Sequence, residues 1–354
     1  MGIYLVLFLI LLFFTLVEIN AKNRIGIVYK ILIVVLLVSV SGFRYGIGND
    51  YGSYYGIFYH SDELSRIEPG FRALVDLLDK LGLTAQALFM VTSILVVVPI
   101  ALTVNKYRPN YFFSALTVYV LSYVYFEGMN TVRQAVAMTI MFVAFCKYIE
   151  NNKIRNFALL TAVAVLFHSS AVVIGIIGWS VLKFSGPRIN IKAFSIALIV
   201  SFVLGYSIRS FAGEVGALAS FFGYGGYLDE MEQRGVSSGI FHYVLNIYAF
   251  VFLFFTKNAS KPFSKFDTNV LKLFILGVII YNFFFEFFIG LRLYWYFYLF
   301  VTFVIPSILP FFNQSSRGIA FLMLVGVLAA YTIVSIDSPY YSPYNYSFEF
   351  IKQR

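Results

Sequence analysis

This sequence is short of charge. Charged residues make up 12% of its 354 residues, hydrophobic residues make up 60%, and the mean hydropathy is +0.83. A soluble domain carries about a quarter charged residues, so this chain has too little polar surface to face water. We therefore expect an all-α integral membrane protein in which residues 1–354 form a single polytopic membrane domain.

The chain also lacks the residues that build disulfides, metal clusters and nucleotide loops. Its single cysteine, Cys146, excludes an internal disulfide and a cysteine-based metal cluster. Its three histidines, His60, His168 and His242, show no metal-ligand spacing, and neither an HExxH motif nor a Gly-rich phosphate loop occurs. We therefore predict that the protein uses no metal and no cofactor.

Long apolar runs fill most of the chain. A bilayer core of roughly 30 Å needs about 20 helical residues. The run 157–183 is too long for one upright crossing and holds Phe-His-Ser-Ser in its middle, so we predict two short helices that form a hairpin around His168. With that hairpin the chain makes about twelve crossings. The candidate spans are 2–19, 27–42, 83–104, 111–126, 131–148, 157–183, 193–209, 240–256, 268–285, 294–312 and 318–336.

Lysine and arginine collect in alternate loops between these runs, for example at 105–110, 150–156 and 257–266. The positive-inside rule places such loops in the cytoplasm, and both termini then lie outside. The net charge of +9 is thus a property of the cytoplasmic loops, and we expect no nucleic-acid partner.

Three segments are predicted on the outer side. The first, 43–82, contains FRALVDLLDKL at 71–81, which predicts an amphipathic helix on the membrane surface. The second is an outer loop at 210–239 that is rich in glycine and acidic residues, and the third is a C-terminal tail at 337–354.

Candidate functional residues begin after the second apolar run, in the sequence RYGIGNDY at 44–51. Arg44, two glycines, Asp50 and Tyr51 would place a cation and a carboxylate close together in a tight loop. A turn with a surface salt bridge is the alternative. Glu68 is a further carboxylate, although the Pro and Gly that follow it are also ordinary at the start of a helix.

Arg133 lies near the start of an apolar run, with Asn130 and Gln134 on the same helical face. An ionised group inside a span costs about 2.5–3.5 kcal/mol at the bilayer centre, which favours a functional site. Snorkelling to the interface is the alternative. His168 and Ser169 lie at the predicted hairpin tip, where a histidine bonded to backbone is the competing interpretation.

Arg292, with Tyr294 close to it, is a further arginine at the end of a predicted span. The orientation set by the loops places Arg44, Arg133, His168 and Arg292 all on the outer side. Guanidinium groups bind phosphate through a planar fork, so three converging arginines suit a diphosphate. A nearby carboxylate or imidazole could accept a proton from an attacking hydroxyl. The energy that drives such a reaction would come from the substrate itself, as in a sugar activated by a lipid diphosphate.

Six short motifs follow one another between about residue 40 and residue 300. They are RYGIGNDYGSYY at 44–55, EPGF at 68–71, NTVRQAVA at 130–137, YIENNKIRNF at 148–157, AVLFHSS at 164–170 and GLRLYWYF at 290–297. Together they resemble the EpsG-type branch of the bacterial polysaccharide polymerases, the Wzy-like O-antigen and capsule polymerases.

The resemblance implies a glycosyltransferase-C-like helical bundle that works without metal on the outer, periplasmic face of the bacterial cytoplasmic membrane. The growing glycan would move from undecaprenyl diphosphate onto a new lipid-linked repeat unit. The implied partners are the undecaprenyl-diphosphate-linked oligosaccharide, the lipid bilayer, and a chain-length regulator and flippase of the same pathway.

The resemblance also assigns roles to the candidate residues. The diphosphate would be bound by Arg44, Arg133 and Arg292. The catalytic candidates are His168 first, then Asp50 and Glu68. The residues that would position the glycan are Tyr51, Asn130, Gln134, Ser169 and Tyr294.

Three other functions compete with this interpretation. A lipid-linked oligosaccharide flippase would carry ionised residues near mid-membrane and a repeated half-structure, whereas here the ionised residues cluster toward one face. A membrane O-acyltransferase acting on glycan would need a cytoplasmic acyl donor and a route across the membrane. A structural scaffold would not explain three outer arginines.

Overall fold

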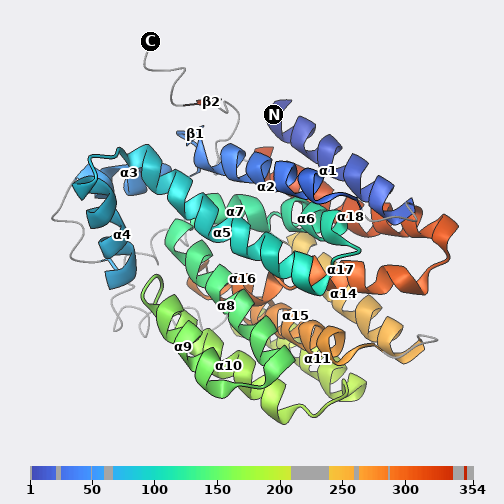
Figure 1. Cartoon of the computed structure of the whole chain (residues 1–354). Coiled ribbons are helices and arrows are strands. Elements are labelled where there is room, and N and C mark those ends of the chain that lie inside the picture. Colours follow the sequence, from blue (N-terminus) through green and yellow to red (C-terminus); the bar gives the residue numbers. More distant parts are fainter. Residues whose placement is uncertain are drawn as a thin grey trace. The chain divides into compact units, whose positions relative to one another are not determined.

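The structure is a computed structural model, and it describes residues 2–20, 25–48, 50–59, 67–208, 239–258, 263–285, 288–337 and 347–348. Within these ranges the chain is almost entirely helical (Figure 1). It divides into two compact units, one formed by Met1–Gly175 and Val301–Arg354 and the other by Ile176–Phe300. The predicted loop at 210–239 and tail at 337–354 lie almost wholly outside the described residues.

The first unit contains most of the helices and the one strand pair. Its elements are α1 (Gly2–Asn20), α2 (Ile27–Gly42), β1 (Arg44–Tyr45), α3 (Tyr51–Tyr59), α4 (Pro69–Lys80), α5 (Ala85–Tyr107), α6 (Phe112–Leu121), α7 (Val124–Asn130), α8 (Val132–Asn151), α9 (Ile154–Val165), α17 (Val301–Ile308), η3 (Leu309–Phe311), α18 (Gln314–Asp337) and β2 (Ser347–Phe348). Strand β2 pairs antiparallel with β1, so that Phe348 lies opposite Arg44.

The second unit consists of α11 (Ile191–Ile208), α14 (Gly239–Asn258), α15 (Lys265–Phe284) and α16 (Phe288–Tyr298). Helix α10 (Ala171–Phe184) begins in the first unit and continues into the second.

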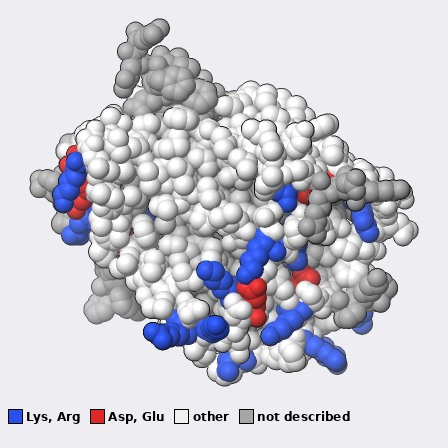
Figure 2. Space-filling view, in the orientation of Figure 1, with Lys and Arg blue, Asp and Glu red and all other residues white. Residues whose placement is uncertain are grey.

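Each predicted apolar run is helical. Among the described residues six helices are long and apolar enough to cross a membrane, α6 and α7 form a further pair bent by 54°, and five shorter helices are also apolar. Their outer faces are apolar too: Leu9 and Phe13 on α1 are 58% and 62% exposed. Figure 2 shows a broad surface without charge, with lysine and arginine gathered at its borders. The all-α membrane class is confirmed, and the count of about twelve crossings stays a prediction.

The predicted span at 111–126 is not one straight helix, because the helix breaks between α6 and α7 and bends there by 54°. Tyr123 adopts a left-handed conformation with φ of 70°, which is unfavourable for a residue other than glycine. The break frees the carbonyl of Leu121, and Thr332 on α18 donates to it at 2.7 Å. Tyr123 itself is buried among aromatic rings that include Tyr331. This packing and the added hydrogen bond hold the break in place.

The predicted hairpin around His168 is confirmed. Helix α9 ends at Val165 and α10 begins at Ala171, with a five-residue turn between them. The two helices touch closely at Gly175, where an added Cβ would lie 2.8 Å from the Thr161 methyl group. The turn therefore carries His168 at the tip of the helix pair.

The predicted amphipathic helix is α4. Its residues Phe71, Val75 and Leu78 are buried at a spacing of three to four residues, whereas Asp76 and Asp79 are exposed. Helix α3, which precedes it, was not predicted, because its Gly- and Tyr-rich sequence has no clear period. The location of α4 on a membrane surface stays a prediction.

In the second unit one buried amide joins three helices. Asn282 on α15 accepts hydrogen bonds from His242 Nε2 at 2.7 Å and from Asn246 Nδ2 at 2.7 Å, both on α14. Its own amide donates to Ser201 on α11 at 3.0 Å. Helix α11 approaches Asn282 so closely that any side chain at Gly205 would collide with its backbone oxygen.

We expect Asn282→Ala to lower the unfolding temperature of the purified protein, because it leaves buried donors on α14 without an acceptor, each at a cost of about 1–3 kcal/mol. Ser207→Ala is the control, since that exposed hydroxyl bonds only to its own helix at Val203. Equal unfolding temperatures for the two variants, followed by intrinsic fluorescence in detergent, would show that Asn282 does not hold the unit together.

Candidate active site

Arg44 is enclosed by the protein. Its side chain follows α2 and is 1% exposed. Nη1 donates to the Ser41 carbonyl at 2.5 Å and Nη2 to the Met129 carbonyl at 3.0 Å, while the guanidinium lies 4.6 Å from the centre of the Phe89 ring. Arg44 thus ties the ends of α2 and α7 together over α5, and these contacts use backbone oxygens as the partners of its charge.

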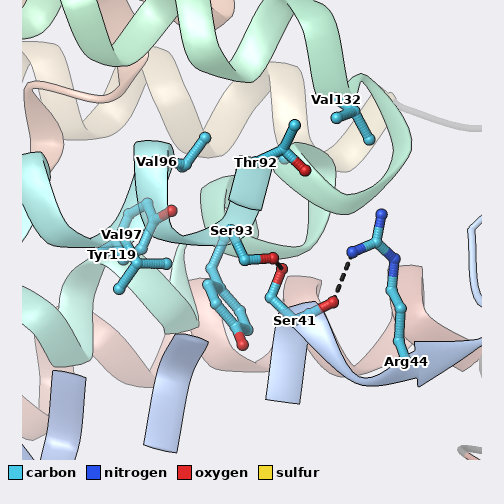
Figure 3. A pocket seen from close by; sticks show the side chains of 10 residues that line it. Ser41, Arg44, Thr92, Ser93, Val96, Val97, Tyr119 and Val132 are labelled. Carbon is cyan, nitrogen blue, oxygen red and sulfur yellow. Dashed lines mark hydrogen bonds between the residues drawn. The ribbon is translucent and has the colours of Figure 1, made fainter. Parts of the chain in front are cut away.

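A small polar pocket of about 10 Å³, room for about one water molecule, adjoins Arg44. Ser41, Thr92, Ser93 and Tyr119 contribute hydroxyl groups to its lining, and Ser93 donates to Ser41 at 2.8 Å (Figure 3). Val132, the residue before Arg133, is also part of the lining. Hydroxyl groups in this position can hold water against the buried charge.

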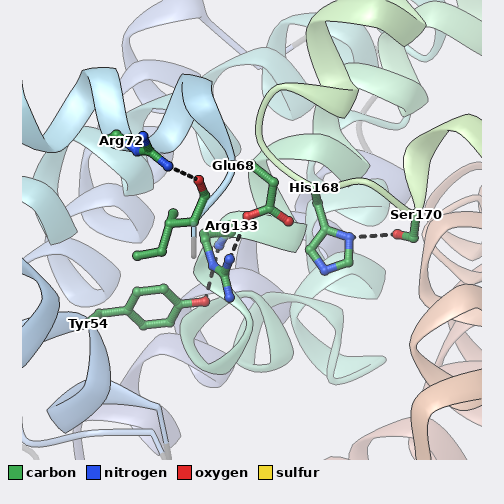
Figure 4. Close-up of polar contacts among 7 residues, drawn as sticks. Tyr54, Glu68, Arg72, Arg133, His168 and Ser170 are labelled. Carbon is green, nitrogen blue, oxygen red and sulfur yellow. Dashed lines mark hydrogen bonds and ion pairs between the residues drawn. The ribbon is translucent and has the colours of Figure 1, made fainter. Parts of the chain in front are cut away.

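Arg133 is the second residue of α8 and forms an ion pair with Glu68. The distance from Nη1 to Glu68 Oε2 is 2.5 Å, and the two side chains are 28% and 18% exposed. The hydroxyl of Tyr54 on α3 accepts a hydrogen bond from the backbone N–H of Arg133 at 3.5 Å (Figure 4). Burial raises the pKa of the Tyr54 phenol, and Arg133 acts in the opposite direction. The phenol therefore stays protonated beside the guanidinium.

Glu68 is available to Arg133 because it does not cap α4. It occupies the N-cap position, yet its side chain makes no capping hydrogen bond. The N–H of Gly70 in the first turn donates instead to the Leu166 carbonyl at 2.8 Å. The hairpin turn therefore does part of the capping, and the carboxylate points to Arg133.

His168 lies in that same turn. Its Nδ1 is 2.7 Å from the Ser170 hydroxyl, and the neighbouring Phe167 packs on the core that includes Tyr54, Phe71 and Val132. Figure 4 shows Glu68 between Arg133 and His168. Three segments far apart in the sequence, 68–71, 130–134 and 167–170, thus meet at one place in the first unit.

The remaining candidates of the first unit surround this place. Asp50 precedes α3, and its charge acts on the Tyr54 phenol. Tyr51 is buried and stacks on Phe89, with ring centres 4.5 Å apart. Asn130 ends α7 and faces Gly48, whose φ is +98° and where an added Cβ would lie 2.7 Å from the amide oxygen. Two further candidates are the buried Gln134 and the exposed Ser169.

Arg292 and Tyr294 belong to α16 in the second unit. Tyr294 is 2% exposed and packs edge-on against Tyr281, with ring centres 4.8 Å apart. Arg292 is half-buried on the same helix. The convergence of Arg292 with Arg44 and Arg133 on one diphosphate stays a prediction.

The sequence did not reveal two parts of this site. Tyr54 lies in a run of tyrosines and glycines, and nothing in that run distinguishes the tyrosine that contacts Arg133. Gly70 looked like an ordinary helix start, whereas its missing side chain is what lets the hairpin turn approach α4. Within the described ranges no group of three or more His, Cys, Asp or Glu residues could hold a metal ion.

The helices and this cluster of ionised groups define a multi-pass helical membrane protein with a polar site at the head of α8. The chain belongs to the EpsG family, whose model matches residues 27–348. No curated protein and no solved structure matches it. Family membership supports a role of the polysaccharide-polymerase type and the membrane setting that such a role requires.

We expect Gly70→Ala to impair glycan production strongly, because its Cβ would lie 2.8 Å from both the Cβ and the carbonyl oxygen of Leu166. Separating α4 from the hairpin turn would move Glu68 relative to His168, and a displacement of about 1 Å can cost about 100-fold in rate. The measurement is complementation of a strain that lacks the gene, with protein level followed by immunoblot.

Gly52→Ala is the matched control, since no atom lies within 4 Å of its added Cβ. If Gly70→Ala and Gly52→Ala complement equally well, the contact between α4 and the hairpin turn has no part in function.

Proposed function

We propose that this protein is a polysaccharide polymerase of the outer face of the bacterial cytoplasmic membrane. It transfers the growing glycan from undecaprenyl diphosphate to a hydroxyl of a new lipid-linked repeat unit. The observation that carries this proposal is the meeting of EPGF, NTVRQ and FHSS at one place, with Arg133 paired to Glu68 beside the turn of His168. The family supports the general role, and this geometry supports the chemistry.

In the transfer the acceptor hydroxyl oxygen attacks the anomeric carbon of the donor glycan. The bond from that carbon to the diphosphate oxygen breaks, and undecaprenyl diphosphate leaves with the electron pair. Arg133 stabilises the charge that develops on the leaving group, since its fork can hold two phosphate oxygens. The acceptor proton passes to His168, and Arg44 and Arg292 are further candidates for the diphosphate.

The outer location is supported by the two ends of α8. Arg133 lies at its start, while Glu150, near its end, pairs with Lys106 at 2.6 Å. At 1.5 Å per residue these ends are about 25 Å apart, close to the thickness of a bilayer core. The basic loop around Lys106 is cytoplasmic by the positive-inside rule, so the site at the head of α8 faces outward.

Deletion of the gene should leave single lipid-linked repeat units on the outer face of the membrane, because flipping of the repeat units continues while polymerisation stops. The measurement is gel analysis of extracted glycan together with accessibility of the lipid-linked units to an impermeant enzyme on intact cells. Repeat units that accumulate facing the cytoplasm would show a flippase instead, and unchanged polymer would contradict both functions.

His168→Gln should abolish turnover while substrate binding changes little, because glutamine can form hydrogen bonds but cannot accept the proton. The purified protein in nanodiscs is assayed for polymer length and, separately, for binding of the lipid-linked substrate. A folded and fully active His168→Gln protein would remove His168 from the reaction.

A further inference from the structure

Arg133 is only partly engaged. Its guanidinium contacts Glu68 through Nη1, while its buried Nε has no hydrogen-bond partner within the described residues. A guanidinium has five N–H donors, so donors remain for an additional anion. Tyr54 accepts from the backbone N–H of Arg133 and so holds the start of α8 beside α3 (Figure 4).

Glu68 also has few contacts that fix its carboxylate. One of its oxygens, Oε2, meets Nη1 at 2.5 Å, and its partner in the described structure is Arg133. The carboxylate makes no capping hydrogen bond to α4, and the N–H of Gly70 donates to the Leu166 carbonyl instead. Nothing in the fold of α4 therefore requires Glu68 to keep this contact.

The pair is also open to exchange. The exposed fractions of 28% for Arg133 and 18% for Glu68 leave the contact within reach of water. Because the contact is not sealed from water, opening it does not leave either charge in a fully dry site, where the cost would be several kcal/mol. A diphosphate carries more charge than a carboxylate and can place two oxygens on one guanidinium fork, so it competes well for Arg133.

We propose that Glu68 is the resident counter-ion of Arg133, which the diphosphate of the lipid-linked donor displaces and which pairs with Arg133 again as the diphosphate product leaves. The proposal rests on the function proposed above and adds a role in product release. Before the donor binds, Glu68 keeps Arg133 neutralised and oriented. After transfer, its return competes with undecaprenyl diphosphate for the same guanidinium. Glu68 is in this sense a positioning residue that acts through Arg133.

The test is binding of inorganic pyrophosphate, and of a short-chain polyprenyl diphosphate, to the full-length protein in nanodiscs. Glu68→Gln removes the competing charge, so we expect both ligands to bind about two- to fivefold more tightly, the change that corresponds to about 0.5–1 kcal/mol for an ion pair within reach of water. Inhibition by the diphosphate product should increase by the same factor. A residue with a merely structural role would not tighten binding when it is replaced.

Asp76→Asn is the matched control, because it removes the same charge from the exposed face of the same helix. We expect it to bind pyrophosphate as the unchanged protein does. If it tightens binding as much as Glu68→Gln, the effect is general electrostatics and the proposal is overturned. Glu68→Asp, which keeps the charge but is one methylene shorter, covers the case in which Glu68→Gln does not fold, and it should bind more tightly than the unchanged protein.

The outcomes separate this proposal from the proposed function. If the unchanged protein polymerises and a folded Glu68→Gln binds pyrophosphate no more tightly, the counter-ion role fails and the polymerase stands. If the unchanged protein does not polymerise, and Arg133→Lys leaves pyrophosphate binding intact, the polymerase itself fails and takes the counter-ion role with it.

Discussion

An arginine at the head of an apolar helix must be given partners, and much of the first unit is arranged to supply them to Arg133. Glu68 comes from the start of α4 and Tyr54 from α3, and both helices precede the first long span of the site, α5. The hairpin turn holds α4 in place through the Gly70 N–H and the packing of Phe167. Without these contacts the charge of Arg133 would lie at an apolar interface without compensation.

The need to compensate the charge of Arg133 also explains why the site combines rigidly positioned segments with an ion pair that can change partners. Backbone hydrogen bonds, a close glycine contact and an aromatic core position the three segments. The ionised atoms themselves meet through a partly exposed pair, which contributes little to stability. This division lets the ionised atoms change partners while the frame stays in place, because a deeply buried pair could not open without a large penalty.

The sequence predicted those features that follow from the bilayer. The run 157–183 had to fold back because a membrane core is about 30 Å thick, and Arg133 was recognisable because ionised groups are rare in apolar runs. The pairing of Arg133 with Glu68 joins residues 65 positions apart, and no local pattern indicates such a contact. The break at Tyr123 was also missed, since its left-handed conformation depends on Thr332, more than 200 residues later.

Arg44 and Arg133 looked alike in the sequence, and the structure separates them. Arg44 gives its terminal nitrogens to two backbone carbonyls and is almost completely enclosed, whereas Arg133 faces a carboxylate at a contact that water can reach. Arg44 therefore belongs to the frame of the site, because its contacts join α2, α5 and α7. Arg133 lies at the head of α8 with donors left over for an additional anion, so of the two arginines it is the one suited to bind a ligand by direct contact.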